Sequence, residues 1–201
     1  MSAKPFLNPT PGMFIQEDWF EGADSFLDLV KKCAGFEYSP TAWTRSRTGG
    51  GNNSSVNDHR SSVESDLNAI RGVINEPEPE FESLRVAFTQ FHEILDRLIN
   101  NFRRSYDLHL TQDEGFRVIR YQNKAEYRIH HDHIAENSRV LSFVCFLNDD
   151  FEGGQLEFPL QKITVEPKAG SVVVFPSNFP FAHIAHPVME GTKYSLVTWF
   201  K

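Results

Sequence analysis

Residues 139–175 read RVLSFVCFLNDDFEGGQLEFPLQKITVEPKAGSVVVF, and this stretch decides the fold. Its short runs of Val, Ile, Leu and Phe are separated by turn residues, including Asn148-Asp149-Asp150, Gly153-Gly154 and Pro167-Lys168-Ala169-Gly170. Runs of this kind are typical of short β-strands joined by tight turns. The stretch therefore predicts strands over Arg139–Leu147, Gln155–Phe158, Ile163–Glu166 and Ser171–Phe175.

The same pattern extends to both sides of that stretch. It predicts further strands over Arg117–Tyr121, Glu126–His131, Ala182–His186 and Lys193–Phe200, with Glu190-Gly191 as a turn. Short strands in series without intervening helices favour a sandwich or a jelly roll. The expected fold is mainly β with flanking helices (α+β): a double-stranded β-helix (jelly roll, cupin-like) core with N-terminal supporting helices.

The N-terminal half predicts the helices that support this core. An amphipathic helix is expected over Asp24–Cys33, after a short strand at Phe14-Ile15. A longer helix follows Pro79, because apolar residues at alternating steps of three and four share one stripe: Phe81, Leu84, Phe88, Phe91, Leu95, Leu98 and Phe102. This aromatic stripe favours packing against a sheet over a coiled coil, and it leaves the oligomeric state open.

Length favours one domain over residues 1–201. Within it, we expect residues 1–115 to form a helical and mixed support with a substrate loop, and residues 116–201 to form the catalytic jelly roll. The Gly-rich stretch from Thr48 to Ser55 is interpreted either as a flexible surface loop or as a lid over an active site.

Composition and charge narrow the class of protein. The formal net charge of −7 disfavours a general nucleic-acid-binding protein, which would need clustered positive charge. No apolar run approaches the length needed to cross a bilayer, and the N-terminal residues do not resemble a secretory signal. Cys33 and Cys145 fall in a helical and a strand pattern, which favours buried free thiols. These features predict a cytoplasmic protein with neither nucleic-acid nor membrane partners.

The most unusual tetrapeptide is His130-His131-Asp132-His133. On a strand, residues two apart face the same side, so His130 and Asp132 can converge on one ion. Two histidines and one carboxylate form the facial set of ligands of non-haem Fe(II) oxygenases. A third ligand is therefore expected on a neighbouring strand, and His183 and His186 are both candidates.

Several motifs stand around this tetrapeptide in a fixed order. Tyr121 comes nine residues before His130, and the downstream motifs are Arg139, Phe146-Leu147-Asn148, Phe151-Glu-Gly-Gly-Gln-Leu-Glu-Phe158, Val165-Glu-Pro-Lys-Ala-Gly170 and His183-Ile-Ala-His-Pro-Val-Met-Glu-Gly-Thr-Lys193. This order, which continues to Trp199, resembles the core of prolyl 4-hydroxylase-type 2-oxoglutarate oxygenases. The first half of the chain resembles that family only loosely.

The resemblance implies Fe(II) and 2-oxoglutarate as cofactors, with ascorbate as a candidate reductant. It selects His183 as the distal iron ligand, beside His130 and Asp132, and gives His186 a structural role. The implied reaction is hydroxylation of peptidyl proline, with oxidative decarboxylation of 2-oxoglutarate to succinate and CO2.

The resemblance also assigns the residues that bind the co-substrate and the substrate. Lys193 is expected to pair with the distal carboxylate of 2-oxoglutarate, with Tyr121 and Ser195 reaching the same group. Arg60 begins an Arg-Ser-Ser element that resembles an Arg-Thr-Ser element of prolyl hydroxylases, although an ordinary turn and helix cap would explain it too. Arg60, Tyr127 and Trp199 are the candidate substrate residues.

Three other functions remain open from the sequence. The nearest is hydroxylation of a free amino acid or another small molecule. Another is a non-catalytic, cupin-like binding protein, which the intact set of His130, Asp132, His183 and Lys193 disfavours. A zinc site built from His130, His131 and His133 is the third, and strand alternation divides these histidines between two faces.

Overall fold

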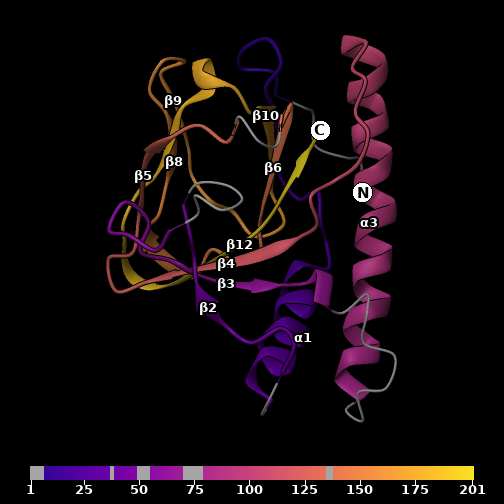
Figure 1. Ribbon diagram of the computed structural model, residues 1–201, viewed down its shortest axis with the longest axis vertical. Coiled ribbons are helices and arrows are strands. Elements are labelled where there is room, and N and C mark those ends of the chain that lie inside the picture. The colour runs from indigo at the N-terminus through magenta and orange to yellow at the C-terminus, as the bar shows by residue number, and fades with distance from the viewer. Residues whose placement is uncertain (1–6, 37–38, 49–54, 70–78, 135–137) are drawn as a thin grey trace.

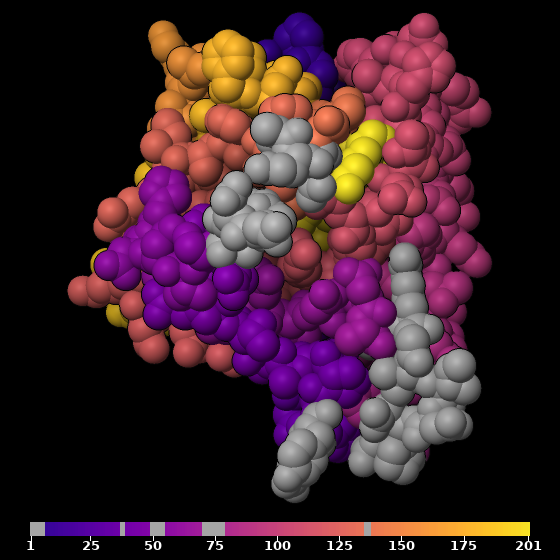
Figure 2. All heavy atoms as spheres, in the orientation of Figure 1, coloured from indigo at the N-terminus to yellow at the C-terminus, as the bar shows by residue number. Residues whose placement is uncertain are grey.

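The computed structural model describes residues 7–36, 39–48, 55–69, 79–134 and 138–201. Two antiparallel sheets face each other, and two long helices cover the outer side of the larger sheet (Figure 1). In the space-filling view, the helix over residues 79–106 forms one flank of the molecule (Figure 2). This arrangement confirms the predicted mainly-β fold with supporting helices.

The larger sheet runs in the order β1-β10-β6-β12-β4-β3-β2, with β7 paired to β12. Its strands are β1 (Phe14–Gln16), β10 (Val172–Pro176), β6 (Leu141–Phe146), β12 (Val188–Phe200), β4 (Arg117–Gln122), β3 (Val63–Asp66), β2 (Thr44–Arg45) and β7 (Phe151–Gly153). The smaller sheet runs β5-β11-β8-β9. Its strands are β5 (Tyr127–His130), β11 (His183–Ala185), β8 (Leu156–Phe158) and β9 (Ile163–Val165), and a short 3-10 helix, η2 (Phe179–Phe181), leads into β11.

Helices α1 (Ala23–Gly35) and α3 (Pro79–Tyr106) bear out the predicted helices. Every member of the predicted apolar stripe of α3 is buried: Phe81, Leu84, Phe88, Phe91, Leu95, Leu98 and Phe102. Phe91 stands at the centre of this interface, with its ring 5.8 Å from that of Phe116 and 5.9 Å from that of Phe143 on β6. The stripe therefore packs against the sheet, as the sequence predicts, and fixes the outer face of the strands that carry the site.

One predicted turn is wrong. Glu190-Gly191 was expected to separate two strands, but β12 continues through it from Val188 to Phe200. The first part of β12 pairs with β7, with a register shift between Val188 and Glu190, and Gly191 adopts a φ of 76°. A glycine bends the strand there without ending it, because it tolerates a positive φ at no steric cost.

Strands β2, β3 and β7 were not predicted from the sequence. Strand β3 reads Val-Glu-Ser-Asp and lacks the apolar alternation that marks a half-buried strand. It nevertheless pairs along β4, with Glu64 opposite Ile119 and Asp66 opposite Arg117. Its polar character follows from its position, because the face that carries Glu64 borders the cavity described below.

Three further predictions concern the two cysteines, the Gly-rich stretch and membrane-spanning helices. Cys33 and Cys145 are buried free thiols, as expected. Thr48 and Ser55, the ends of the Gly-rich stretch, form a two-residue antiparallel bridge, while residues 49–54, on which the lid hypothesis depends, lie outside the described residues. Within the described ranges, no helix combines the length and the apolar character that a membrane span requires.

Candidate active site

A cavity opens between the two sheets. It is lined by all the residues that the resemblance assigns to iron, co-substrate and substrate: Arg60, Tyr121, Tyr127, His130, Asp132, His183, Lys193, Ser195 and Trp199. These residues come from β4, β5, β11 and β12 and from the segments that adjoin β3 and β5. The fold therefore collects at one place side chains that are widely separated in the sequence.

His130, Asp132 and His183 meet at the smaller sheet. β5 and β11 pair antiparallel with His130 directly opposite His183, and the two imidazole centroids are 4.2 Å apart. Nε2 of His130 is 3.6 Å from Oδ1 of Asp132, and Nε2 of His183 is 3.8 Å from Oδ2 of the same carboxylate. Strand β5 ends at His130, one residue earlier than predicted, and Asp132 lies just beyond that end.

Hydrogen bonds orient both imidazoles with Nε2 toward Asp132. Nδ1 of His130 lies 2.8 Å from the carbonyl oxygen of Arg128, and Nδ1 of His183 lies 3.0 Å from that of Phe181. A carbonyl partner at Nδ1 fixes the tautomer that leaves Nε2 free to bind a metal. Among the described residues, these three are the group whose ligand atoms could hold one ion, with all such atoms within 4.8 Å of one another.

The electrostatics of the group suit a divalent cation. Burial, and then the neighbouring His183, lower the pKa of His130, so its imidazole is neutral and can act as a ligand. Burial alone would raise the pKa of Asp132, but His183, His130 and hydrogen bonds from Ser142 and Trp199 lower it to about 2. Asp132 is therefore a carboxylate at neutral pH.

The other histidines near the site do not join this group. Nε2 of His186 lies 2.6 Å from Oε2 of Glu157, which supports the predicted structural role. Nδ1 of His133 lies 3.1 Å from the carbonyl oxygen of Arg139, and His131 is exposed. The zinc alternative based on His131 and His133 therefore gains no support from the described residues.

Lys193 lies deeper in the cavity, on β12. Its ammonium group donates a hydrogen bond to the carbonyl oxygen of Gly154 and lies 5.5 Å from the ring centroid of Tyr121, its partner across the β12–β4 pair. Only 2% of Lys193 is exposed. Its described partners include no carboxylate. An anionic ligand would therefore supply the negative charge that the buried ammonium group needs as a partner.

Ser195 and Tyr121 flank that ammonium group. Ser195 follows Lys193 at the next inward-facing position of β12, and its Oγ is buried without a hydrogen-bond partner among the described residues. The Tyr121 hydroxyl is buried beside Ser62, and burial raises the pKa of Tyr121, which keeps its proton available for donation. An orphaned hydroxyl, a phenol and a buried lysine together fit one carboxylate of a small dicarboxylic acid.

The buried lysine predicts a pH-dependent stability in the absence of co-substrate. Burial lowers the pKa of Lys193 from its ordinary 10.5 to about 7. Between these two values the unfolded chain binds a proton that the folded protein does not, so this group makes stability rise with pH. Relative to Lys193→Met, the free energy of unfolding of the wild type should rise by about 1.4 kcal/mol per pH unit above pH 7.

Urea titrations of both proteins at pH 7.0, 7.75 and 8.5 would measure this difference. The subtraction removes the thiol and phenol titrations, which both proteins share. A difference that is constant over this pH range would mean that the ammonium group is not desolvated as described.

The mouth of the cavity is lined by the candidate substrate residues. The Tyr127 ring stacks on the His130 imidazole, and the Arg60 guanidinium lies 4.9 Å from the centre of the Tyr127 ring. Trp199 stacks against Arg139, whose guanidinium lies 3.9 Å from the centre of the indole. Aromatic rings and guanidinium groups at the mouth provide flat surfaces on which a substrate chain could lie.

Two residues that support the metal group were not identified from the sequence. Ser142 contacts Asp132, and the only available signal was a polar residue at an inward-facing position of an otherwise apolar strand. Glu114 accepts hydrogen bonds from Nε and Nη2 of Arg139, while Nη1 of Arg139 donates to the backbone oxygen of Asp132 at 3.2 Å. No local sequence pattern marks Glu114, because its partner Arg139 lies 25 residues further along the chain, just before β6.

Comparison with known proteins agrees with this geometry. Residues 116–201 match the 2OG-Fe(II) oxygenase superfamily. A putative prolyl 4-hydroxylase of Acanthamoeba polyphaga mimivirus is 26% identical over 127 residues, covering 52% of this chain and 51% of the relative. Prolyl 4-hydroxylase 1 of Arabidopsis thaliana is 29% identical over 115 residues, covering 44% and 41% respectively. The chain thus spans about half the length of the curated relatives it matches.

Solved structures with the same fold cover nearly all of the chain. A Trichoplax adhaerens prolyl hydroxylase, in complex with a peptide fragment of the hypoxia-inducible-factor oxygen degradation domain, gives a TM-score of 0.71 at 20% identity, covering 95% of this chain and 84% of that one. A Pseudomonas putida prolyl-4-hydroxylase gives 0.67 at 21% identity, covering 94% and 92%. These likenesses confirm the predicted jelly roll.

The fold and the site define a class of protein, a double-stranded β-helix with a two-histidine, one-carboxylate metal group. The comparison gives a family for part of the chain: residues 116–201 match the 2OG-Fe(II) oxygenase superfamily, and the relatives and structural neighbours described above are named prolyl hydroxylases. This family implies Fe2+ and 2-oxoglutarate as cofactors, and the donor set described above fits both.

Proposed function

We propose that the chain is an Fe(II)- and 2-oxoglutarate-dependent dioxygenase that hydroxylates peptidyl proline and releases succinate and CO2. The observation that carries this proposal is the convergence of His130, Asp132 and His183 in one cavity that also holds the buried Lys193. Two imidazoles and a carboxylate leave coordination positions open on an octahedral ion. A buried ammonium group in the same cavity would then anchor a dicarboxylic co-substrate.

Each residue has a defined role in this proposal. His130, Asp132 and His183 would hold the iron, while Lys193, Tyr121 and Ser195 would bind the distal carboxylate of 2-oxoglutarate. When bound, the iron and its co-substrate supply the oxidising chemistry. The chain needs no general base for that chemistry, and none is assigned.

The cavity walls would exclude water from the reacting groups. Apolar side chains line the cavity that holds the metal group and Lys193, among them Ile119, Phe146, Leu156 and Val197. Desolvation strengthens both the contact of Lys193 with a carboxylate and that of Asp132 with a cation. The walls therefore increase the affinity of the site for its charged ligands and protect the reaction from side reactions.

A proline in a peptide or protein is the proposed substrate. The relatives are named prolyl 4-hydroxylases, and one structural neighbour is a prolyl hydroxylase in complex with a peptide. Arg60, Tyr127 and Trp199 border the mouth and would contact the peptide. A free amino acid or another small molecule is the alternative substrate, and a non-catalytic cupin-like binding protein is the alternative class.

We also propose that residues 1–201 act as one domain, with 116–201 as its catalytic core, in a cytoplasmic setting. Contacts between α3 and residues of the core support the single domain, and the buried free thiols are compatible with a reducing compartment. Neither nucleic acid nor a membrane is proposed as a partner, and the oligomeric state is left open.

The proposal is tested by following both products of the reaction. The protein is incubated with Fe(II), 2-oxoglutarate and ascorbate, and with proline-containing peptides, free proline or a cell extract. We expect succinate release in step with the gain of one oxygen on peptidyl proline, measured by mass spectrometry. Oxygen gain on free proline alone would favour the small-molecule alternative, and well-folded protein without any turnover would favour the non-catalytic class.

A further inference from the structure

Arg117 occupies the outermost position on the cavity face of β4. Ile119 and Tyr121, which line the cavity, lie two and four residues further along the same strand. Because strand residues two apart share a face, Arg117 continues this row toward the mouth, about 7 Å beyond Ile119. On the neighbouring strand its partner is Val197, and its guanidinium lies 5.7 Å from the centre of the Trp199 ring.

Three arginines lie beside the aromatic rings that line the cavity, and they differ in how their donors are used. Arg139 is bound to Glu114 through two nitrogens and to the backbone of Asp132 through the third. Arg60 is buried and donates to Ser62 Oγ and to the carbonyl oxygen of Arg47. Arg117 is half-buried and, within the described part of the chain, donates no hydrogen bond.

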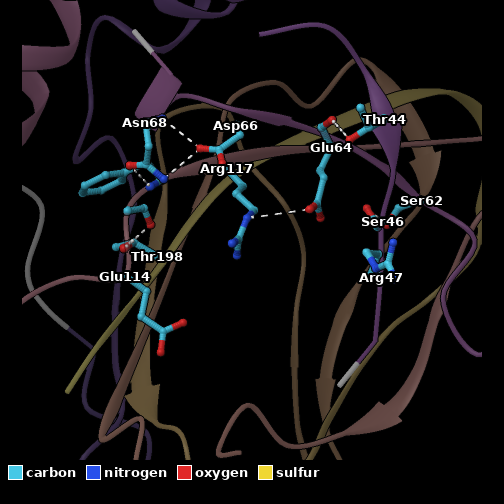
Figure 3. A network of polar contacts seen from close by, with 12 residues as sticks. Thr44, Ser46, Arg47, Ser62, Glu64, Asp66, Asn68, Glu114, Arg117 and Thr198 are labelled. Atoms are coloured by element: carbon cyan, nitrogen blue, oxygen red, sulfur yellow. Dashed lines mark hydrogen bonds and ion pairs between the residues drawn. The ribbon is translucent and has the colours of Figure 1, made fainter. Parts of the chain in front are cut away.

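Among the described residues, Glu64 carries the carboxylate that lies within ion-pair distance of Arg117. Asp66 is opposite Arg117 on β3, but its Oδ1 accepts hydrogen bonds from Asn68. Figure 3 shows the two side chains extending toward one another from neighbouring strands, with 3.7 Å between Nε of Arg117 and Oε1 of Glu64. This separation is too long for a hydrogen bond. Glu64 is shared, because its Oε2 lies 3.4 Å from Nη2 of Arg60. The terminal nitrogens of Arg117 are thus free to bind a further carboxylate.

We propose that Arg117 binds an acidic side chain of the peptide substrate, so that the enzyme prefers prolines with Asp or Glu nearby. This inference rests on the proposed function. A guanidinium group presents two parallel donors that match a carboxylate, and at the mouth of a cavity it would contact the peptide outside the reacting residue. An extended peptide advances by about 3.4 Å per residue, which places the acidic residue within about one to three positions of the proline.

Glu64 would limit this preference. Its carboxylate lies on the same side of Arg117 as the cavity and repels an acidic peptide, so removing its charge should strengthen the preference. Two substitutions on neighbouring strands are therefore expected to act in opposite directions. A general disturbance of the fold would not produce this pattern, since both substrates are compared on the same protein.

The experiment measures kcat/KM for matched proline peptides that carry Asp, Asn or Lys at each position from three before to three after the proline. For the wild type, we expect the Asp peptide to be favoured over the Asn peptide by about tenfold at the best position, the effect of one charge-assisted contact. This ratio should fall to near one in Arg117→Gln and rise in Glu64→Gln. Arg104→Gln removes an equal charge from the exposed end of α3 and serves as the control, with an unchanged ratio.

The outcomes separate the inference from the function on which it rests. An Asp to Asn ratio near one in the wild type at every position, or an unchanged ratio in Arg117→Gln, would overturn the role of Arg117 while hydroxylation itself remains. A wild type that hydroxylates none of the peptides would overturn both. Partial screening of the ratio by added salt would support a charged contact at the exposed mouth.

Discussion

Replacing His183 by alanine is expected to abolish iron binding and to lower succinate formation by more than about a hundredfold. Losing a residue that only contacts a metal ligand already costs about 10- to 100-fold, so losing a ligand itself should cost more. The imidazole of His183 faces that of His130 across the β5–β11 pair, and its Nε2 is directed at Asp132. Without it, one imidazole and one carboxylate remain, which is too few to hold Fe(II) firmly. Anaerobic titration with Fe(II) and 2-oxoglutarate, followed by the weak visible charge-transfer band, measures the loss.

His186→Ala is the matched control for that substitution. His186 lies three residues further along the same segment, but its Nε2 is bound to Glu157 and faces away from the metal group. The control should keep the absorption band and the turnover. Iron binding that survives in His183→Ala but is lost in His186→Ala would show that the distal ligand has been assigned to the wrong histidine.

Lys193→Met is expected to raise the 2-oxoglutarate concentration needed for half-maximal turnover by about a hundredfold, because it removes a buried charge-assisted contact. Methionine matches the length of the lysine stem and leaves no unpaired charge, so the iron should remain bound. The same substitution should raise the Tm of the protein without co-substrate at pH 7. At that pH the buried ammonium group, whose hydrogen-bond acceptor is the Gly154 carbonyl oxygen, destabilises the folded wild type.

The control for this prediction is Lys168→Met. Lys168 is exposed and paired with Glu17 on the surface. Its loss should leave the co-substrate requirement unchanged and should alter the free energy of unfolding by no more than a few tenths of a kcal/mol. If Lys193→Met kept the wild-type requirement for 2-oxoglutarate, another residue would have to anchor the co-substrate. A lower Tm in Lys193→Met would argue that the lysine stabilises the fold.

Two local patterns in the sequence predicted part of the site and part of the fold. Alternation along a strand placed His130 and Asp132 on one side, and the periodic stripe from Phe81 to Phe102 predicted the long helix. The choice between His183 and His186 was not local. It depended on the resemblance to a family, because spacing alone cannot give the register that sets His183 opposite His130.

The remaining differences have physical causes. Strand β3 was missed because it is bordered by β2 and β4 and turns polar residues toward the cavity, so its sequence lacks an apolar period. The partnership of Glu114 with Arg139 was missed because a buried ion pair between distant segments leaves no local signal. The free donors of Arg117 likewise depend on the 3.7 Å that separates it from Glu64, a distance that only coordinates can give.

The direct pairing of β5 with β11 has a consequence for how the proposed metal site would form. Histidines far apart along the chain become neighbours only once this non-local ladder has closed, and closing a long loop is slow and entropically unfavourable. Under the proposed function, iron would therefore bind late in maturation, after the strand that contains residue 183 has docked. Strand β5 lies at the edge of the smaller sheet. An ion bound by His130 on β5 and His183 on β11 would link the two strands and stabilise β5 against local unfolding.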